Sequence, residues 1–258
     1  MRSKRAAKLR SILGTIIVIA IIAINFMNTS EYGKALKAKL QTMFGNIPFI
    51  SQQAETSYES LGDIPQWDGE AAYAVINDDD PQFSDEDIEK GKSETWLNLS
   101  SLDILGRCGE SYSCLNASMM PKEERGPIGH VRPSGWHTQK YDRSVISDLY
   151  LYNRAHLQAF SLTGLNDDVR NLITGTRFMN LNMTDYEIPI AQYLEKNPDN
   201  HVLYRVTPIF NGSELVARGV HVEAMSIEDS SIRYNRYLYN EQPKIRIDHL
   251  TGNSELIE

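Results

Sequence analysis

The C-terminal part of the chain carries the pattern that most restricts its fold. Residues 201–210 alternate between apolar and polar side chains, as a half-buried strand does, and Asn211 and Gly212 follow as a hairpin turn. Residues 215–225 then predict the returning strand, and residues 231–239 predict a third. Strands joined by short turns pair antiparallel, because a parallel pair needs a long crossover connection. The pattern therefore predicts a mainly antiparallel sheet.

Shorter segments predict further strands and a helix. Residues 73–77 are an apolar run that ends at an acidic turn. Ser84, followed three residues later by Asp87, has the spacing of a helix N-cap. Residues 149–152 and 244–248 predict two more short strands. The chain thus predicts a mixed α+β domain, in which helices pack on an antiparallel sheet.

Glycine and proline mark two other segments. Residues 106–136 are rich in Gly, Pro and charged residues, so we expect mainly loops that line one side of a cleft. Residues 190–196 predict a helix. Pro189 limits where that helix can begin, because proline lacks the N–H that a helix interior needs.

The N-terminus has the charge pattern of a membrane-targeted segment. Five of the first ten residues are Lys or Arg, and residues 12–27 are almost wholly apolar. No small-residue cleavage site follows, so we expect an uncleaved single-pass anchor, with the basic flank in the cytoplasm and the remainder of the chain outside the cell. The alternative is a cleaved signal peptide, which would release a secreted protein beginning near Ser30.

Composition divides the chain into three parts. Residues 1–30 predict the basic flank and the membrane anchor. Residues 31–69 are polar and rich in Lys, Ser, Gln and Ala, which predicts an extracellular stalk or linker. Residues 70–258 are long enough to form one well-packed domain, and they contain the motifs that carry chemistry.

The distribution of charge restricts the kind of partner. A formal net charge of −8 disfavours a tight, purely electrostatic binder of nucleic acid, since phosphate contacts come mainly from Lys and Arg. Much of the acid lies in residues 63–89, which predicts a solvated face, with calcium binding as the alternative. Residues 122–177 carry a group of basic side chains. A positive cleft on an acidic body suits a catalyst that must release its product.

Two groups of residues each have two interpretations. Cys108 and Cys114 would close a small disulfide loop outside the cell, or they are two free, buried thiols. No neighbouring Cys or His completes a zinc site with them in the sequence. Tyr234, Tyr237 and Tyr239 offer rings on which bases would stack, but we expect them to pack the sheet instead.

The main chemical signal is a run containing Asn153, Arg154 and His156, followed downstream by Arg177 and Asn180. Hydrolysis of a phosphodiester needs an activated water and neutralisation of the charge that develops on the phosphate. A neutral histidine is a suitable general base near neutral pH, so His156 is the candidate base. Mg²⁺ binds oxygen ligands and needs few from the protein, so Asn180 is the candidate metal ligand. Arg154 and Arg177 are candidate clamps for phosphate oxygens.

This arrangement resembles the DNA/RNA non-specific endonucleases, the ββα-metal group, whose signature is Asp-Arg-Gly-His followed by a metal-binding Asn. Residues 106–109, 120–129 and 133–137 are similar to segments of the streptococcal-type DNases and membrane-anchored DNA-entry nucleases. The resemblance covers roughly residues 70–250. It implies a ββα-metal nuclease fold, with a central, mainly antiparallel sheet flanked by helices, and metal-dependent cleavage that leaves 5′-phosphate ends.

The resemblance also assigns roles by position. His156 matches the histidine that activates water, and Asn180 matches the direct metal ligand, with Mg²⁺ as the expected metal and Mn²⁺ as the alternative. Asn171 matches a supporting Asn, and Glu187 matches an acidic residue that orders metal-bound waters. Candidate substrate contacts in the same region are Arg125, Trp136, His137 and Arg170. For His137, packing is the competing interpretation.

Two residues depart from the family signature. Asn153 stands where the family has Asp, which keeps the hydrogen-bonding capacity but removes the charge, and Ala155 stands where the family has Gly. We interpret both as variation within a subgroup and keep Asn153 as a supporting residue. The rival interpretation is a catalytically impaired surface receptor that binds DNA without cutting it.

Together these features predict an outward-facing, membrane-tethered, Mg²⁺-dependent endonuclease without sequence specificity that acts on DNA and also on RNA. A tethered nuclease suits DNA uptake, in company with an uptake machinery, and it also suits degradation of extracellular DNA. The expected partners are therefore nucleic acid, the membrane through residues 1–30, and components of DNA uptake.

Overall fold

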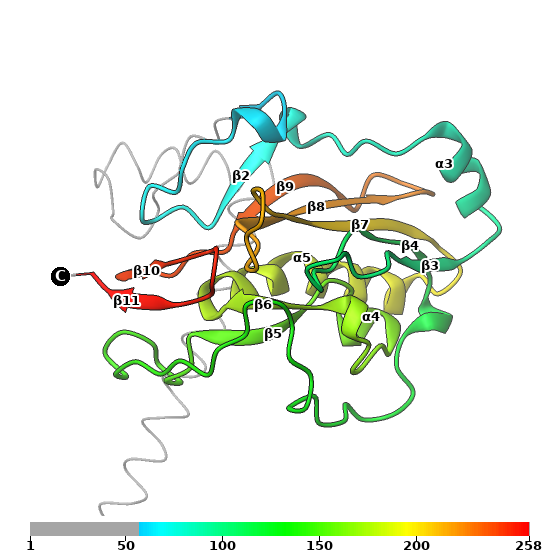
Figure 1. Cartoon of the computed structure of the whole chain (residues 1–258). Coiled ribbons are helices and arrows are strands. Elements are labelled where there is room, and N and C mark those ends of the chain that lie inside the picture. The colour runs from blue at the N-terminus through cyan, green and yellow to red at the C-terminus, as the bar shows by residue number, and fades with distance from the viewer. Residues whose placement is uncertain (1–56, 258) are drawn as a thin grey trace, which may run out of the picture. The chain divides into compact units, whose positions relative to one another are not determined.

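A seven-stranded sheet forms the centre of the computed structural model, which describes residues 57–257 (Figure 1). Its strands are β1 (Ser57–Tyr58), β2 (Tyr73–Ile76), β3 (Trp96–Leu99), β4 (Ser111–Leu115), β7 (Val202–Ile209), β8 (Gly219–Ser226) and β9 (Arg233–Tyr239). They lie in the order β1-β2-β9-β8-β7-β4-β3. The β1–β2 pair is parallel and every other neighbouring pair of this sheet is antiparallel, which confirms the predicted mainly antiparallel sheet.

The hairpin predicted at Asn211 and Gly212 exists, but its loop is longer than the dipeptide indicates. β7 and β8 pair along their whole lengths, and their connection spans residues 210–218. Glu214 organises this loop, because its carboxylate accepts hydrogen bonds from the backbone N–H of Asn211 (3.0 Å) and from Arg218 Nε (2.9 Å). A local ion pair within a nine-residue loop therefore replaces the tight turn.

β4 lies inside the segment that the sequence assigned mainly to loops. Its inward-facing residues Ser111 and Ser113 are fully buried, so the apolar alternation that marks a strand is missing from the sequence. Ser113 Oγ donates a hydrogen bond to Gln158 Oε1 (2.9 Å), which satisfies the hydroxyl. Because these buried positions are serines rather than apolar residues, the sequence pattern did not reveal the strand.

A second, two-stranded sheet precedes the long helix. β5 (Tyr152–His156) pairs antiparallel with β6 (Leu172–Thr176), and α5 (Arg177–Lys196) follows directly. The order strand, strand, helix agrees with the ββα arrangement that the resemblance implies. The hairpin and α5 lie along one face of the seven-stranded sheet (Figure 1).

The start of α5 corrects the helix predicted over residues 190–196. The helix begins at Arg177 and continues through Pro189. Its N-cap is Thr176, whose side chain accepts a hydrogen bond from the backbone N–H of Met179 (3.0 Å). Pro189 removes one hydrogen bond from the helix. The residue is exposed, so its ring does not pack against the sheet.

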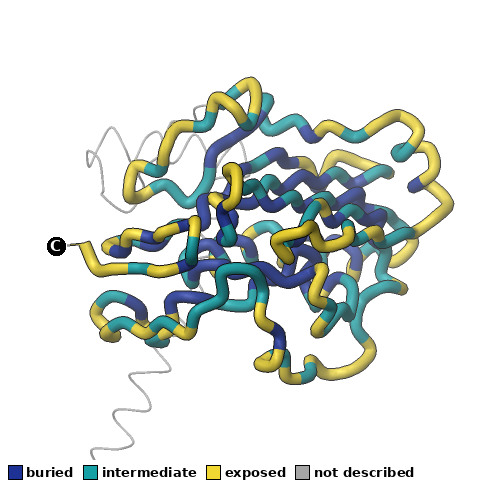
Figure 2. Tube along the Cα trace, in the orientation of Figure 1, coloured by how far each residue is buried: buried dark blue, intermediate teal, exposed yellow. Residues whose placement is uncertain are grey.

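The core lies between α5 and the sheet. Tyr204 and Val222 from the sheet pack in one cluster with Met179 and Leu194 from α5, and all four are almost fully buried. Figure 2 shows the buried residues concentrated along the strands, whereas the loops around them are mostly exposed. Strand alternation therefore gives each sheet strand one face towards α5.

Residues 59–72, which connect β1 to β2, pack against the end of β9. Tyr58, Leu61 and Trp67 pack against a cluster that includes Tyr237 and Tyr239. Residues 57–69, which the sequence assigned to a linker, thus contribute to the packed domain. The helix predicted after Ser84 is confirmed as α3 (Asp85–Gly91), because Ser84 Oγ accepts a hydrogen bond from the Asp87 N–H (3.1 Å).

The remaining elements are short. They are the 3-10 helices η1 (Leu61–Asp63), η2 (Asn77–Asp79), η3 (Ala117–Met119) and η4 (Val169–Asn171), the helix α4 (Phe160–Thr163), and the strands β10 (Ile245–Ile247) and β11 (Ser254–Leu256). β10 matches the strand predicted over residues 244–248 and pairs with β11.

The structure decides between the two interpretations given for the cysteines and for the tyrosines. Cys108 and Cys114 are both free and buried. Tyr234, Tyr237 and Tyr239 are at most 9% exposed, so they pack the sheet, as expected. Part of the acidic tract also packs, because Asp79 accepts a hydrogen bond from Arg236 Nε (2.6 Å) on β9.

The predicted basic flank and membrane anchor, and most of the predicted stalk, fall on residues 1–56 and lie outside the described residues. Within residues 57–257, no helix has the length and apolar character needed to cross a membrane.

Candidate active site

A cleft of about 670 Å³ is formed by β5, α5 and the loops that precede β5. Eight of the predicted site residues line this β5–α5 cleft: Arg125, Trp136, Asn153, Arg154, His156, Arg177, Asn180 and Glu187. The structure also brings Asp148, Tyr150 and Thr184 into the cleft, which the sequence did not predict. Folding thus gathers residues from segments far apart in the chain.

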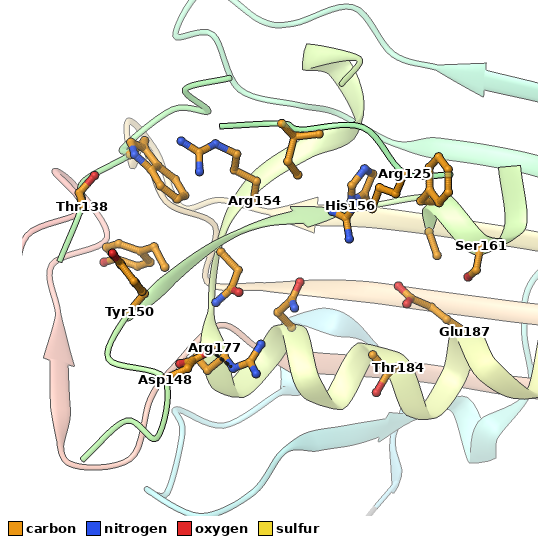
Figure 3. Close-up of a pocket in the computed structure, with 17 residues that line it drawn as sticks. Arg125, Thr138, Asp148, Tyr150, Arg154, His156, Ser161, Arg177, Thr184 and Glu187 are labelled. Atoms are coloured by element: carbon orange, nitrogen blue, oxygen red, sulfur yellow. Dashed lines mark hydrogen bonds and ion pairs between the residues drawn. The ribbon is translucent and has the colours of Figure 1, made fainter. Parts of the chain in front are cut away.

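Four cleft residues form one stripe on α5. Arg177, Asn180, Thr184 and Glu187 follow one another at intervals of three, four and three residues, which places them on the same helix face. Figure 3 shows Arg177, Thr184 and Glu187 along the helix, with Arg154 and His156 on the neighbouring strand. The spacing is present in the sequence, but it has meaning only when the helix is known to begin at Arg177.

The hydrogen bonds of His156 fix which ring nitrogen is basic. Nε2 lies 2.9 Å from the backbone carbonyl oxygen of Asn166, so Nε2 carries the proton and donates it. Nδ1 therefore keeps its lone pair, which accepts a hydrogen bond from Nη2 of Arg125 (3.3 Å). Burial lowers the pKa of His156, and the charge of Arg125 lowers it further against the opposing hydrogen bond to Asn166. His156 is thus a neutral base at neutral pH.

Asn171 supports the strand end that carries His156, and it does not line the cleft. Its side chain accepts a hydrogen bond from the Gln158 N–H (2.8 Å) and donates one to the Gln158 carbonyl (2.9 Å). The residue is fully buried. This reciprocal pair locks β5 to the segment before β6, so Asn171 acts on the site through the backbone.

The two predicted phosphate clamps have different surroundings. Arg154 donates from Nε to the Val131 carbonyl (2.6 Å) and from Nη2 to the Gly129 carbonyl (2.9 Å), and its guanidinium lies 3.9 Å from the centre of the Trp136 ring. Arg154 therefore also holds the loop before β5 in place. Arg177 Nε lies 2.8 Å from Asp148 Oδ2, an ion pair at the mouth of the cleft.

Glu187 is the acidic member of the α5 stripe. Burial raises its pKa to about 7, although the charge of Arg125 acts in the opposite direction. A carboxyl with this pKa is poised to exchange a proton near neutral pH. Arg125 thus influences both His156 and Glu187 from the loop side of the cleft.

Two predicted substrate contacts lie outside the cleft. Arg170 is half-exposed and pairs with Asp168 at 2.7 Å. His137 donates from Nε2 to the Thr251 carbonyl (2.9 Å), which is a packing contact. The side chains of Arg170 and His137 contact these other partners, and the contact of His137 agrees with the competing interpretation that it packs.

The polar side chains of the cleft have unused bonding capacity. Trp136 Nε1, Asp148 Oδ1 and Asn153 Nδ2 are buried without a hydrogen-bond partner. The Asn180 amide forms no hydrogen bond with the described residues, so its oxygen is free to bind a ligand. No group of three or more His, Cys, Asp and Glu side chains within residues 57–257 forms a metal cage. One amide oxygen with carboxylates nearby fits a hard cation that keeps most of its water ligands.

The N-terminus of α5, which carries Arg177 and Asn180, is held by a distant segment. Gln242 Oε1 accepts a hydrogen bond from the Phe178 N–H (3.0 Å), and Asn240 Oδ1 accepts one from the Thr176 N–H (2.7 Å). The Arg177 N–H donates to the Leu151 carbonyl (2.7 Å). The first N–H groups of the helix are therefore already paired, so phosphate must be bound by side chains rather than by the helix end.

Gln242→Leu is expected to lower the free energy of unfolding by about 1–3 kcal/mol, because it leaves the Phe178 N–H buried without an acceptor. Gln242→Glu keeps an acceptor next to the positive end of the helix and should be close to wild type. Urea unfolding followed by circular dichroism measures the difference. Equal stability of the two variants would show that this hydrogen bond contributes nothing.

Solved nuclease structures share this fold. NucA from Streptococcus agalactiae with magnesium ion bound has a TM-score of 0.62 and 21% identity, with 76% of this chain and 92% of NucA covered. At that identity the likeness shows the fold alone. The Sda1 nuclease with bound zinc ion has a TM-score of 0.57 and 25% identity, with 72% of this chain and 96% of Sda1 covered.

One curated protein and one family model match the sequence of this chain. A deoxyribonuclease from Streptococcus dysgalactiae subsp. equisimilis is 33% identical over 108 residues, which are 40% of this chain and 32% of that protein, so the match spans about a third of the relative. The family model for DNA/RNA non-specific endonuclease matches residues 88–228, more than half of the chain and the whole β5–β6–α5 unit. The chain therefore belongs to the DNA/RNA non-specific endonuclease family.

Proposed function

We propose that this endonuclease is metal-dependent, lacks sequence specificity, and hydrolyses phosphodiester bonds of both DNA and RNA. The observation that carries the proposal is the state of His156. Its Nε2–H is held by the Asn166 carbonyl, so a basic Nδ1 remains in a cleft that also contains Asn180 and Glu187. A fixed, neutral imidazole beside arginine side chains suits removal of a proton from water next to a bound phosphate.

Each side chain of the cleft has a separate role in the proposed hydrolysis. His156 Nδ1 takes the proton of the attacking water, and the Asn166 carbonyl stabilises the imidazolium that results. Arg125 and Arg177 neutralise charge on the non-bridging phosphate oxygens, and Arg154 adds charge while it holds the loop. Glu187, on the same helix face as Asn180, orients water near the leaving oxygen.

Asn180 would hold the metal through its free amide oxygen. Bound there, Mg²⁺ would supply positive charge to the phosphate and its leaving oxygen. The oxygen donors of the cleft favour a hard cation over one that needs several His or Cys ligands, and Mn²⁺ is the natural substitute. NucA, which shares the fold, has been solved with magnesium bound, and Sda1 with zinc bound.

The cellular location of the enzyme is proposed from the sequence alone. The basic flank and apolar run of residues 1–30 would anchor the protein in the membrane as a single-pass segment, with the nuclease domain outside the cell. In that position the enzyme would degrade DNA during uptake, or clear extracellular DNA at the cell surface. Secretion after cleavage of a signal peptide is the alternative, and it would place a shortened protein in the medium.

Incubation of the purified protein with supercoiled plasmid and with single-stranded RNA, in Mg²⁺ and in EDTA, tests the activity. We expect nicking and then degradation of both substrates in Mg²⁺, and intact substrates in EDTA. Intact plasmid in every metal, with DNA retained in a gel shift, would instead support a surface receptor that binds DNA without cutting it.

Arg125→Ala is expected to move the acidic limb of the pH profile of kcat/KM to higher pH. The positive charge of Arg125 lowers the pKa of His156 and of Glu187, so its loss raises both. A base with a higher pKa is protonated, and therefore inactive, up to a higher pH. Arg125→Lys keeps the charge and should keep the limb near the wild-type position. An acidic limb that stays in place in the alanine variant would contradict this electrostatic link.

A further inference from the structure

Tyr150 is a cleft residue with no role in the chemistry described above. It lies where the cleft meets the loop before β5, next to Asp148, and 44% of its surface is exposed. Figure 3 shows Tyr150 and Thr138 together at the end of the cleft away from Arg125 and His156. The next two residues in the chain, Leu151 and Tyr152, are almost fully buried, so the exposure of Tyr150 is local.

The backbone around Tyr150 is held firmly. Tyr150 forms a bridge with Lys140, the Tyr141 N–H donates to the Leu149 carbonyl (2.9 Å), and the Leu151 N–H donates to the Gln139 carbonyl (3.1 Å). Leu149 has a positive φ of 77°, a conformation that a leucine adopts only when its surroundings impose it. The ring is therefore presented on a fixed support.

Lys140 adds a positive charge beside the ring. Its Nζ lies 4.8 Å from the centre of the Tyr150 ring, and the side chain is otherwise exposed. The Tyr150 hydroxyl forms no hydrogen bond with the described residues. The Tyr150 ring thus has a cation on one face and is otherwise exposed at the end of a polar cleft. A nucleobase can stack on such a ring, and the cation can contact the phosphate of the same nucleotide.

The separation between Tyr150 and the general base His156 indicates which nucleotide of the substrate would bind at Tyr150. Tyr150 lies six positions before His156 along the chain, which corresponds to roughly 20 Å of extended chain. That distance is too large for the nucleotide at the scissile bond. A nucleobase on Tyr150 must therefore belong to a flanking nucleotide, and it must be unpaired, because the faces of a paired base are covered by its neighbours in the duplex.

We propose that Tyr150 and Lys140 form a subsite that stacks an unpaired nucleobase flanking the scissile phosphate, and that this subsite gives the enzyme a preference for single-stranded nucleic acid. The inference rests on the proposed function for its consequence in catalysis, but binding at the subsite needs no cleavage. Tyr150 supplies the stacking surface, and Lys140 supplies charge for the phosphate of the same nucleotide.

Equilibrium binding tests the subsite without catalysis. A single-stranded oligonucleotide that contains 2-aminopurine is titrated with the full-length protein in EDTA, and stacking is read as quenching of its fluorescence. We expect quenching by the wild type and by Tyr150→Phe, which keeps the ring, and a loss of most of it with Tyr150→Leu. Lys140→Ala should weaken binding, whereas Lys196→Ala, an exposed lysine outside the cleft, should not. Equal quenching by the leucine and phenylalanine variants would overturn the proposal.

Kinetics then tests the preference. Tyr150→Leu should lower the ratio of kcat/KM for single-stranded over double-stranded DNA about tenfold, mainly through KM, since loss of one stacked base costs about that much. Thermal unfolding checks that the variant is folded. An unchanged ratio would overturn the proposed preference. A wild-type protein that quenches the probe but cuts no substrate would reject the proposed function and leave the subsite in place.

Discussion

His156→Ala is expected to lower kcat/KM for plasmid cleavage by about 10²–10⁴-fold, the usual contribution of a positioned general base. The wild-type imidazole donates from Nε2 to the Asn166 carbonyl (2.9 Å) and keeps Nδ1 as its basic nitrogen. No other histidine lines the cleft, so no second imidazole described there replaces this base. Single-turnover cleavage with enzyme in excess measures the effect without a contribution from product release.

Two controls separate the loss of the base from a general disturbance. Added imidazole should restore part of the activity of His156→Ala, because the vacated space lies in an open cleft. His130→Ala is the matched control: His130 is 64% exposed, pairs with Asp167 and does not line the cleft, so its loss should leave cleavage unchanged. Full activity of His156→Ala would refute the proposed mechanism even if the protein is a nuclease.

Asn180→Ala is expected to weaken metal binding by more than roughly 100-fold. Loss of a residue that only hydrogen-bonds to a metal ligand lowers metal affinity by roughly 10–100-fold, and loss of a direct ligand should cost more. The Asn180 amide lines the cleft and forms no hydrogen bond with the described residues, so it has no competing structural task. Titration of the apoprotein with Mn²⁺, followed by electron paramagnetic resonance, measures affinity directly. Cleavage should then require a correspondingly higher concentration of Mg²⁺.

The neighbouring helix positions provide matched controls. Asn180→Asp keeps an oxygen ligand and adds charge, so it should bind the metal at least as well as the wild type. Asn182 is on the same helix, but its amide donates to the Phe178 carbonyl (2.8 Å) and does not line the cleft, so Asn182→Ala should leave metal affinity unchanged. Unaltered Mn²⁺ affinity in Asn180→Ala would place the metal on another ligand.

Much of the domain could be predicted from local sequence. The strands β2, β7, β9 and β10 and the N-cap of α3 follow patterns that depend only on neighbouring residues. His156 and Asn180 were candidates because a short motif and its spacing carried them, whereas Glu187 was assigned only by the resemblance to the family. Family membership was likewise visible in these segments.

Other features required contacts between distant segments. The start of α5 depends on acceptors at Gln242 and Leu151, and without them Pro189 seemed to set the boundary of the helix. β4 depends on Gln158, which satisfies the buried hydroxyl of Ser113. Arg170 pairs with Asp168 outside the cleft, because nearness in sequence does not fix the direction of a side chain.

The sequence by itself indicated the α+β fold class, the family, and the candidate residues for a base and a metal ligand, because these depend on residue type and local spacing. Only the tertiary structure decided how they act together. It fixed Nδ1 of His156 as the basic nitrogen through the Asn166 carbonyl, aligned Thr184 and Glu187 with Asn180, and brought Tyr150 to the end of the cleft. Hydrogen-bond direction, burial and the charge of neighbours arise from segments far apart in the chain, so no local pattern encodes them.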